Sequence, residues 1–224
     1  MQLGNLYFNT GDLTSAERQY QESLAQSADY VYGLAGLGRV RAAQGRYEDA
    51  TRLYNQAIAR MPLPEFVIGL GETEEAAGRT ADAAKQYELV RAMQQLFKAN
   101  GVDTDLELAL FDADHGHDQQ VTLTLARAVY ERRPSIKAAD TLAWALFKAG
   151  QPAEARRYAD EALRLGTRDA LMLYHAGMIA QAQGDSAAAR DYLKRALATS
   201  PHFSPLYVPR AEQALAELSA AASK

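Results

Sequence analysis

The sequence of 224 residues contains no cysteine. This absence excludes disulfide bonds, thiolate nucleophiles and cysteine-ligated zinc sites, but it suits the cytoplasm and the periplasm equally well. An excess of basic residues is missing too, because the formal net charge is −4. Proteins that bind nucleic acid usually carry a strongly basic face, so nucleic acid is not expected as a partner.

Long apolar runs are also missing. No stretch approaches the roughly 18 consecutive apolar residues from which a membrane span is predicted, so none is expected. The first eight residues, MQLGNLYF, have neither a basic segment nor an apolar one, and no secretory signal is predicted in them. The compartment therefore stays open between cytoplasm and periplasm.

Sequence signatures of catalysis are scarce. The phosphate-loop pattern GxxxxGK[ST], the zinc-protease pattern HExxH and the nucleophile pattern GxSxG do not occur. The glycines of Gly33–Gly38 have the wrong order for a dinucleotide fingerprint and lie within a helical pattern. We therefore expect a protein that is not an enzyme and needs no cofactor.

What the sequence does contain is a repeat marked by glycine. Five glycines each begin a short run that ends in alanine, and they are Gly11, Gly45, Gly78, Gly150 and Gly184. The intervals from Gly11 to Gly45, from Gly45 to Gly78 and from Gly150 to Gly184 are each about 34 residues. A weaker copy lies between them at Gly116, and the interval that leads to it from Gly78 is longer by about one helical turn. Six copies in register are a strong signal of a repeat architecture.

Other residue types keep the same period. Four residues after the alanine stands an aromatic residue or leucine, at Tyr20, Tyr54, Tyr87 and Leu193. Seven residues before the turn glycine stands a small residue, at Gly4, Gly38, Gly71, Ala143 and Gly177. Each copy therefore predicts two helices that cross closely at a small residue and are joined by a turn at the glycine.

The pattern resembles the tetratricopeptide repeat, a helix–turn–helix unit of about 34 residues. The resemblance covers roughly residues 1–201 and implies an all-α fold, an α-solenoid (a right-handed superhelix) of about six helix–turn–helix repeats. Because one helix pair cannot bury its own apolar face, neighbouring repeats must stack into a continuous core. We expect repeats 1–3 in residues 1–99, repeats 4–6 in residues 100–202 and an amphipathic capping helix in residues 203–224.

Two departures from the repeat carry information. The first helix is shortened, which would leave Leu6, Tyr7 and Phe8 near an uncapped end of the stack. We expect either that the chain is part of a longer one or that this end mediates self-association. The second helix of repeat 3 is predicted to run long, from about Thr80 to Ala99, and to mark a division between repeats 1–3 and repeats 4–6.

By resemblance, such arrays bind extended peptides or helices in a groove lined by the first helix of each repeat. Repeats 2 and 3 then supply candidate partner-binding residues at Tyr32, Arg39, Glu72 and Glu75. Repeats 5 and 6 supply Lys137, Asp140, Trp144, Phe147, Lys148, Tyr174 and Met178, and Asp114 of repeat 4 faces the same groove. Trp144 serves either as an exposed aromatic anchor or as a side chain packed under the adjoining repeat. A subfamily clamps a terminal carboxylate with paired lysine, arginine and asparagine residues, but only Asn5 matches that pattern, because the other places hold Gly36, Glu65 and Gly69.

One dense cluster of carboxylates and imidazoles runs from Asp112 to Asp118 and includes His115 and His117. It lacks the glycine at the sixth place and the glutamate at the twelfth place of a calcium loop, so we expect a solvated turn between two helices, with Asp or His capping a helix end. His175 is expected to be a hydrogen-bonded residue of the core or groove. The leading hypothesis is a non-enzymatic scaffold for protein interactions, with a peptide or helix of another protein as partner. The alternatives are a structural array that assembles through its ends and, remotely, a metal-dependent hydrolase at the Asp112–Asp118 cluster.

Overall fold

The computed structural model describes residues 2–101, 105–116 and 118–221. Every regular element in these ranges is a helix; they hold thirteen α-helices and no strand. The all-α fold predicted from the repeat is therefore confirmed. The chain divides into two compact units, of which the first comprises residues 1–96 with 200–209 and the second residues 97–199 with 210–224.

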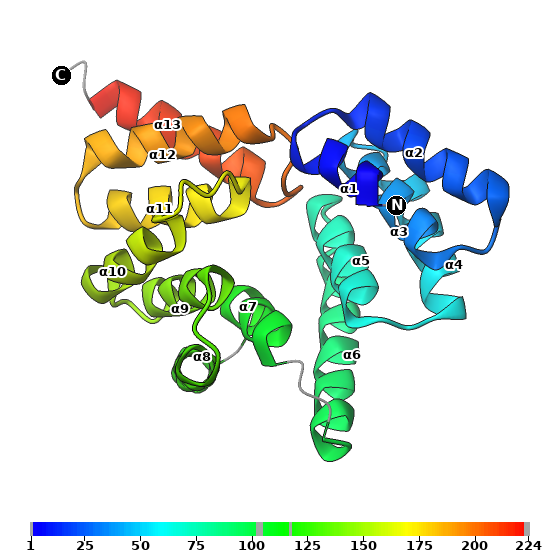
Figure 1. The fold of residues 1–224 in the computed structure, drawn as a ribbon, viewed down its shortest axis with the longest axis horizontal. Helices are drawn as coiled ribbons and strands as arrows, with labels where there is room; N and C mark the ends of the chain where they lie inside the picture. Colours follow the sequence, from blue (N-terminus) through cyan, green and yellow to red (C-terminus); the bar gives the residue numbers. More distant parts are fainter. Residues whose placement is uncertain (1, 102–104, 117, 222–224) are drawn as a thin grey trace. The chain divides into compact units, whose positions relative to one another are not determined.

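The helices follow one another with short connections (Figure 1). Those that begin in the first unit are α1 (Gln2–Asn9), α2 (Leu13–Gln26), α3 (Val31–Ala43), α4 (Tyr47–Arg60), α5 (Pro64–Ala76) and α6 (Thr80–Ala99). The second unit holds α7 (Asp105–His115), α8 (Gln119–Arg132), α9 (Ile136–Lys148), α10 (Pro152–Leu163), α11 (Ala170–Ala182), α12 (Ser186–Thr199) and most of α13 (Tyr207–Ala221). Within each unit, consecutive helices form antiparallel pairs such as α3 with α4 and α11 with α12.

The turns inside the pairs depend on glycine. The five turn glycines predicted from the repeat all have positive φ, between 72° and 84°. A residue with a Cβ rarely adopts this conformation, so glycine ends each first helix with little strain. Gly116 is not among the glycines with positive φ, and the turn of repeat 4 therefore differs from the others.

Small residues let the helices cross closely, as predicted. A Cβ added at Gly71 would lie 2.5 Å from Cε1 of Tyr87, and one at Gly4 would lie 2.8 Å from Cε1 of Tyr20. Both tyrosines are almost fully buried, with exposed fractions of 8% for Tyr87 and 0% for Tyr20. Tyr20 and Tyr87 therefore pack directly on the backbone of these glycines, where an added Cβ would clash with the ring.

Paired side chains join successive repeats within each unit. Both guanidinium nitrogens of Arg41 on α3 contact the carboxylate of Glu17 on α2, at 2.6 and 2.7 Å. In the second unit, Arg127 on α8 makes the same two-pronged contact with Glu154 on α10, at 2.9 and 2.8 Å. Such bidentate pairs are stronger and more directional than single hydrogen bonds.

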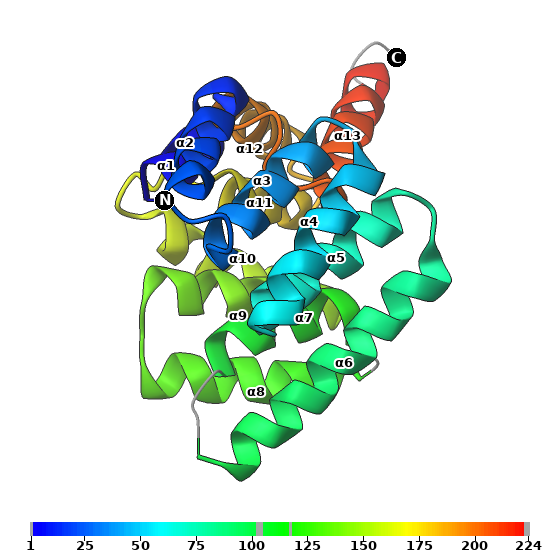
Figure 2. The same cartoon turned by 90° about the vertical axis from the view of Figure 1, so that its right-hand side faces the viewer.

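Two elements interrupt the regular pairing. Helix α6 has 20 residues and runs past the end of α5 (Figures 1 and 2), and the division between the two units falls within it. In the second unit, Arg190 on α12 donates a hydrogen bond of 2.9 Å to the carbonyl oxygen of Leu218 on α13. Helix α13, which lies in the segment predicted as an amphipathic cap, buries Ala211, Ala214 and Leu218 and exposes Glu212 and Glu217. Residues 222–224 of that prediction lie outside the described residues.

Candidate partner-binding surfaces

Each unit has an inner layer made of its odd-numbered helices. The backbones of α1, α3 and α5 approach one another in the first unit, and those of α7, α9 and α11 do so in the second. No two even-numbered helices come comparably close within the described ranges. On this outer side, long side chains such as Arg127 and Glu154 bridge α8 and α10 instead. The inner layer therefore consists of the first helix of each repeat, where partner-binding residues were predicted.

The candidate residues of the first unit keep accessible surface on this layer. Tyr32 on α3 is 37% exposed, and its ring meets that of Phe66 edge to face at 5.5 Å. Arg39 on α3, and Glu72 and Glu75 on α5, are half-buried. A partner that lay along α3 and α5 could therefore touch all four predicted residues.

Arg39 is held in place by α1. Its Cζ lies 3.7 Å from the centre of the Phe8 ring, and its Nη2 donates a hydrogen bond of 2.8 Å to Oδ1 of Asn9. Burial lowers the pKa of Arg39 below its ordinary value, although a guanidinium stays charged at neutral pH. The Nε of Arg39 is buried and has no hydrogen-bond partner within the described residues. This donor is fixed in position and unsatisfied.

Three periodic tyrosines present hydroxyl groups towards the same layer. Tyr20 donates to Oδ1 of Asn5 at 2.5 Å, and Tyr87 donates to Oε2 of Glu75 at 2.7 Å. The hydroxyl of the middle tyrosine, Tyr54, makes no such bond within the described part of the chain. Burial raises the pKa of both Tyr20 and Tyr54, so both hydroxyls remain protonated donors at neutral pH.

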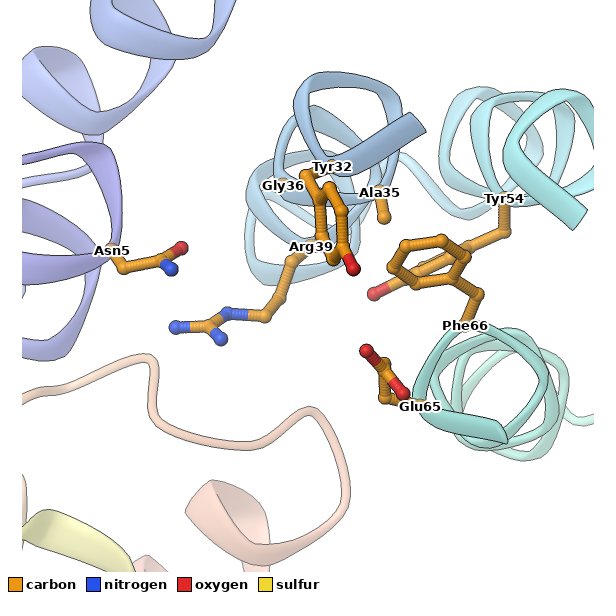
Figure 3. A pocket seen from close by; sticks show the side chains of 8 residues that line it. All are labelled: Asn5, Tyr32, Ala35, Gly36, Arg39, Tyr54, Glu65 and Phe66. Atoms are coloured by element: carbon orange, nitrogen blue, oxygen red, sulfur yellow. The ribbon is translucent and has the colours of Figure 1, made fainter. Parts of the chain in front are cut away.

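A pocket of about 280 Å³ opens among these residues (Figure 3). Tyr32 and Arg39 of α3 line it together with Tyr54 of α4, Glu65 of α5 and Asn5 of α1. The repeat register predicted Tyr32 and Arg39 as contact residues but did not indicate Tyr54 as a lining residue. Tyr54 was assigned to the helix packing, and only the length of its side chain, which carries the hydroxyl through to the inner layer, could have indicated its second role.

In the second unit the predicted aromatic residues are packed inside. Trp144 and Tyr174 are each 2% exposed, and Asp140 is 4% exposed. Burial raises the pKa of Tyr174 to about 12. Trp144 is therefore a packed side chain and not an exposed aromatic anchor. Both rings are therefore core side chains. Their role in partner binding stays a prediction, and it would be indirect, through the neighbouring residues that they hold in position.

The packing around Trp144 connects three helices. Its ring stacks on His175 of α11, with centroids 4.1 Å apart, and its Nε1 donates a hydrogen bond of 2.6 Å to Oδ1 of Asp114 on α7. His175 is fully buried, and its Nδ1 lies 3.0 Å from Oδ2 of Asp140 on α9. The prediction that His175 is a hydrogen-bonded core residue is therefore confirmed.

Four predicted residues of the second unit keep accessible surface. Lys137 is exposed, and Phe147, Lys148 and Met178 are half-buried. The Nζ of Lys148 lies 5.7 Å from the centre of the Trp144 ring, within the range of a cation–π contact. A partner of the second unit would meet these side chains rather than Trp144.

The cluster from Asp112 to Asp118 has other roles in the structure. Asp118 caps α8, because its side chain accepts from the backbone N–H of Gln120 and Val121. Asp114 accepts from Trp144, and His117 lies outside the described residues. No group of three or more acidic or histidine residues that could hold a metal ion occurs within the described ranges. The same ranges hold no helix with the length and hydropathy needed to cross a membrane.

Comparison with known proteins supports the architecture. The family described as "Tetratricopeptide repeat" matches residues 1–62, 35–96 and 141–202. The sequence is also 28% identical, over 185 residues, to the cellulose synthase operon protein C of Xanthomonas axonopodis pv. citri (strain 306). That match covers 83% of this chain and 10% of the relative, so the chain spans about a tenth of the length of the curated relative it matches.

Solved structures share the fold at low sequence identity. A tetratricopeptide repeat protein from Parabacteroides merdae ATCC 43184 aligns with a TM-score of 0.52 and 15% identity, over 97% of this chain and 96% of that one. The APC/C hetero-tetramer Cut9–Hcn1 gives a TM-score of 0.52 and 17% identity, over 92% of this chain and 39% of that one. At such identities the likeness shows the fold and nothing about a partner.

Proposed function

This chain belongs to the tetratricopeptide repeat family, and we propose that it is a non-enzymatic scaffold that binds a peptide or helix of another protein along its inner layer. The observation that carries the proposal is the accessible set of aromatic and charged side chains on α3 and α5, around Tyr32, Arg39 and Glu65. Aromatic anchors beside polar groups are the composition expected of a binding hot spot. The helical repeats supply the rigid surface on which such side chains are presented.

The first unit supports the proposal better than the second. Its inner layer contains a pocket, a ring that is 37% exposed and a buried donor without a partner. In the second unit, Trp144 and Tyr174 are occupied in packing. We therefore propose α3 and α5 as the main contact surface, and Lys137, Phe147, Lys148 and Met178 as secondary contacts.

The test is affinity capture with matched variants. The inner variant combines Tyr32→Ala with Glu65→Lys, both at accessible positions on the inner layer. The control variant is Arg18→Ala on α2, where the side chain is 65% exposed on an outer helix. We expect the inner variant to lose at least about tenfold of the captured partner, a change of about 1.4 kcal/mol in binding free energy, and the control to retain it. Equal capture by both variants would remove the proposal.

A second candidate function is self-association through α1, and a separate observation favours it. Leu3 and Leu6 are 45% and 57% exposed. They stand one repeat before Leu37 and Val40, which are 9% and 0% exposed and pack in one cluster with Ala16 and Tyr20 of α2. The exposed face of α1 therefore carries apolar residues at the positions where α3 packs against α2. The second helix of another repeat could pack against this face in the same way.

Sedimentation over a range of concentrations tests this candidate. Self-association predicts a mass that rises with concentration, and Leu3→Glu with Leu6→Glu should abolish the rise without changing the helical content. A single mass at all concentrations would remove the candidate. The scaffold proposal would stand in either case, because it rests on α3 and α5.

A further inference from the structure

The pocket between α1, α3, α4 and α5 offers hydrogen-bond donors on one side and an acceptor on the other. Figure 3 shows the hydroxyl of Tyr54 and the carboxylate of Glu65 pointing into the same space, with Arg39 along its edge. These three side chains come from three different helices, α4, α5 and α3. A ligand that satisfies this lining must therefore match groups from three helices at once.

Both donors lack an acceptor. The Nε of Arg39 is buried without a hydrogen bond, and the hydroxyl of Tyr54 makes none within the described residues. The corresponding tyrosines of the neighbouring repeats, Tyr20 and Tyr87, both donate to groove side chains. A buried donor without a partner is costly, so a ligand that supplies an acceptor at this place gains more than one that does not.

The donors are also preorganised. Stacking on Phe8 and the hydrogen bond to Asn9 fix the guanidinium of Arg39 before any ligand arrives. The ring of Tyr54 is 5% exposed and lies against Gly69, where an added Cβ would be 2.7 Å from its hydroxyl oxygen. A ligand therefore does not have to order these side chains, and this lowers the entropic cost of binding.

The charges and the hydrogen-bonding groups of the pocket together favour an uncharged ligand. Glu65 lines it, and Glu72 acts electrostatically on both Arg39 and Tyr54. These two carboxylates against one guanidinium disfavour a carboxylate ligand. An ammonium ligand would be attracted by Glu65, but it has no acceptor for Nε of Arg39 or for the Tyr54 hydroxyl.

We propose that this pocket receives an uncharged carboxamide, the side chain of an asparagine or glutamine of the bound peptide. A carboxamide carries an acceptor oxygen for Arg39 and Tyr54 and an NH₂ donor for Glu65. The methylene groups of the same side chain lie against the Tyr32 ring. This assignment rests on the scaffold proposal, because it names one residue type that the partner presents to α3 and α5.

The test is an NMR titration of the full chain with three capped tripeptides that differ in one side chain. The probes are acetyl-Ala-Gln-Ala-amide, acetyl-Ala-Glu-Ala-amide and acetyl-Ala-Lys-Ala-amide, and the signal is the Nε–H resonance of Arg39, assigned with Arg39→Lys. We expect the glutamine peptide to shift this resonance and to bind about tenfold more tightly than the other two. Tightest binding by the glutamate peptide, tightest binding by the lysine peptide, or no shift with any peptide would each overturn the proposal.

Two variants sharpen the result. Tyr54→Phe removes one donor and should weaken the glutamine peptide about fivefold. Glu65→Gln removes the negative acceptor, so the glutamate peptide should then bind more tightly than it does to the unchanged protein. The control is Glu22→Gln on α2, whose side chain is 57% exposed and far from α5 in sequence. Glutamate binding that does not improve in Glu65→Gln would contradict the role given to Glu65.

The titration and the capture experiment fail separately. Selective binding of the glutamine peptide without any captured partner would support the carboxamide assignment and contradict the scaffold proposal. Conversely, the chain could capture a partner through Tyr32 and Glu65 and show no selectivity for the glutamine peptide. That result would support the scaffold proposal and contradict the carboxamide assignment.

Discussion

The Nε1 of Trp144 donates a hydrogen bond of 2.6 Å to Oδ1 of Asp114, a residue 30 positions earlier in the chain. This contact joins α9 to α7 on the inner layer of the second unit. On its other side the indole stacks on His175 of α11. The only tryptophan of the sequence is therefore tied into three successive first helices, and it reports on the packing of the second unit.

The first prediction concerns this hydrogen bond. Asp114→Ala removes the acceptor of this hydrogen bond from the indole N–H of a side chain that is 2% exposed. We expect the free energy of unfolding of the second unit to fall by about 1–3 kcal/mol. Urea denaturation followed by tryptophan fluorescence measures it, since all of that signal comes from Trp144. Asp160→Ala, at a carboxylate that is 51% exposed, serves as the control and should change little; a similar loss in both variants would contradict the role given to Asp114.

The second prediction compares two tyrosines at the same repeat position. Tyr20→Phe loses a hydrogen bond of 2.5 Å to Asn5, whereas Tyr54→Phe removes a hydroxyl that has no bond within the described residues. We expect Tyr20→Phe to lower the free energy of unfolding by about 1 kcal/mol and Tyr54→Phe to change it by less than about 0.5 kcal/mol. Urea denaturation followed by circular dichroism compares them. If Tyr54→Phe were the more damaging change, its hydroxyl would have a structural partner and the pocket would lose a free donor.

The third prediction concerns acid. The hydrogen bonds from Arg41 lower the pKa of Glu17 below its ordinary value of 4.5. A carboxyl whose pKa is depressed by folding stabilises the fold at pH values above its unfolded pKa, and this contribution disappears as the pH falls through the folded-state pKa. Glu17→Gln should therefore lower the free energy of unfolding by about 1–2 kcal/mol near neutral pH and by clearly less at about pH 3.

Denaturation of this variant and of the unchanged protein at both pH values measures the difference. Glu22→Gln is the matched control, because its ion pair with Arg18 spans 3.9 Å between exposed side chains and such pairs contribute little. A loss in Glu17→Gln that stayed the same at both pH values would mean that packing, and not the charge of Glu17, carries the effect.

The periodic features of the structure could be predicted from the sequence. Turn glycines such as Gly45 need a conformation that other residues rarely adopt, and close crossings such as Gly71 against Tyr87 leave no room for a side chain. Both constraints act within one helix pair, so they recur once in each repeat and remain visible in the sequence. The 20-residue length of α6 does not recur, but it was visible because the apolar stripe of this one helix continues past the usual stop.

The site could be predicted only in part. The repeat register placed Tyr32 and Arg39 on the inner layer, but it could not say that Trp144 is 2% exposed. That burial depends on His175 and Asp114, which belong to other repeats and reach the indole through side-chain packing. The pocket has the same origin, because it is the space left between side chains of α1, α3, α4 and α5.

Site-specific photo-crosslinking in cells tests the central claim, that the inner layer of the first unit binds a protein partner, most directly. A photoreactive phenylalanine derivative is placed at Tyr32, which is 37% exposed on the inner layer, or at Arg18, which is 65% exposed on an outer helix. The scaffold account predicts a discrete crosslinked protein from Tyr32 and none from Arg18. Crosslinks from Arg18 alone, or the same products from both positions, would contradict it.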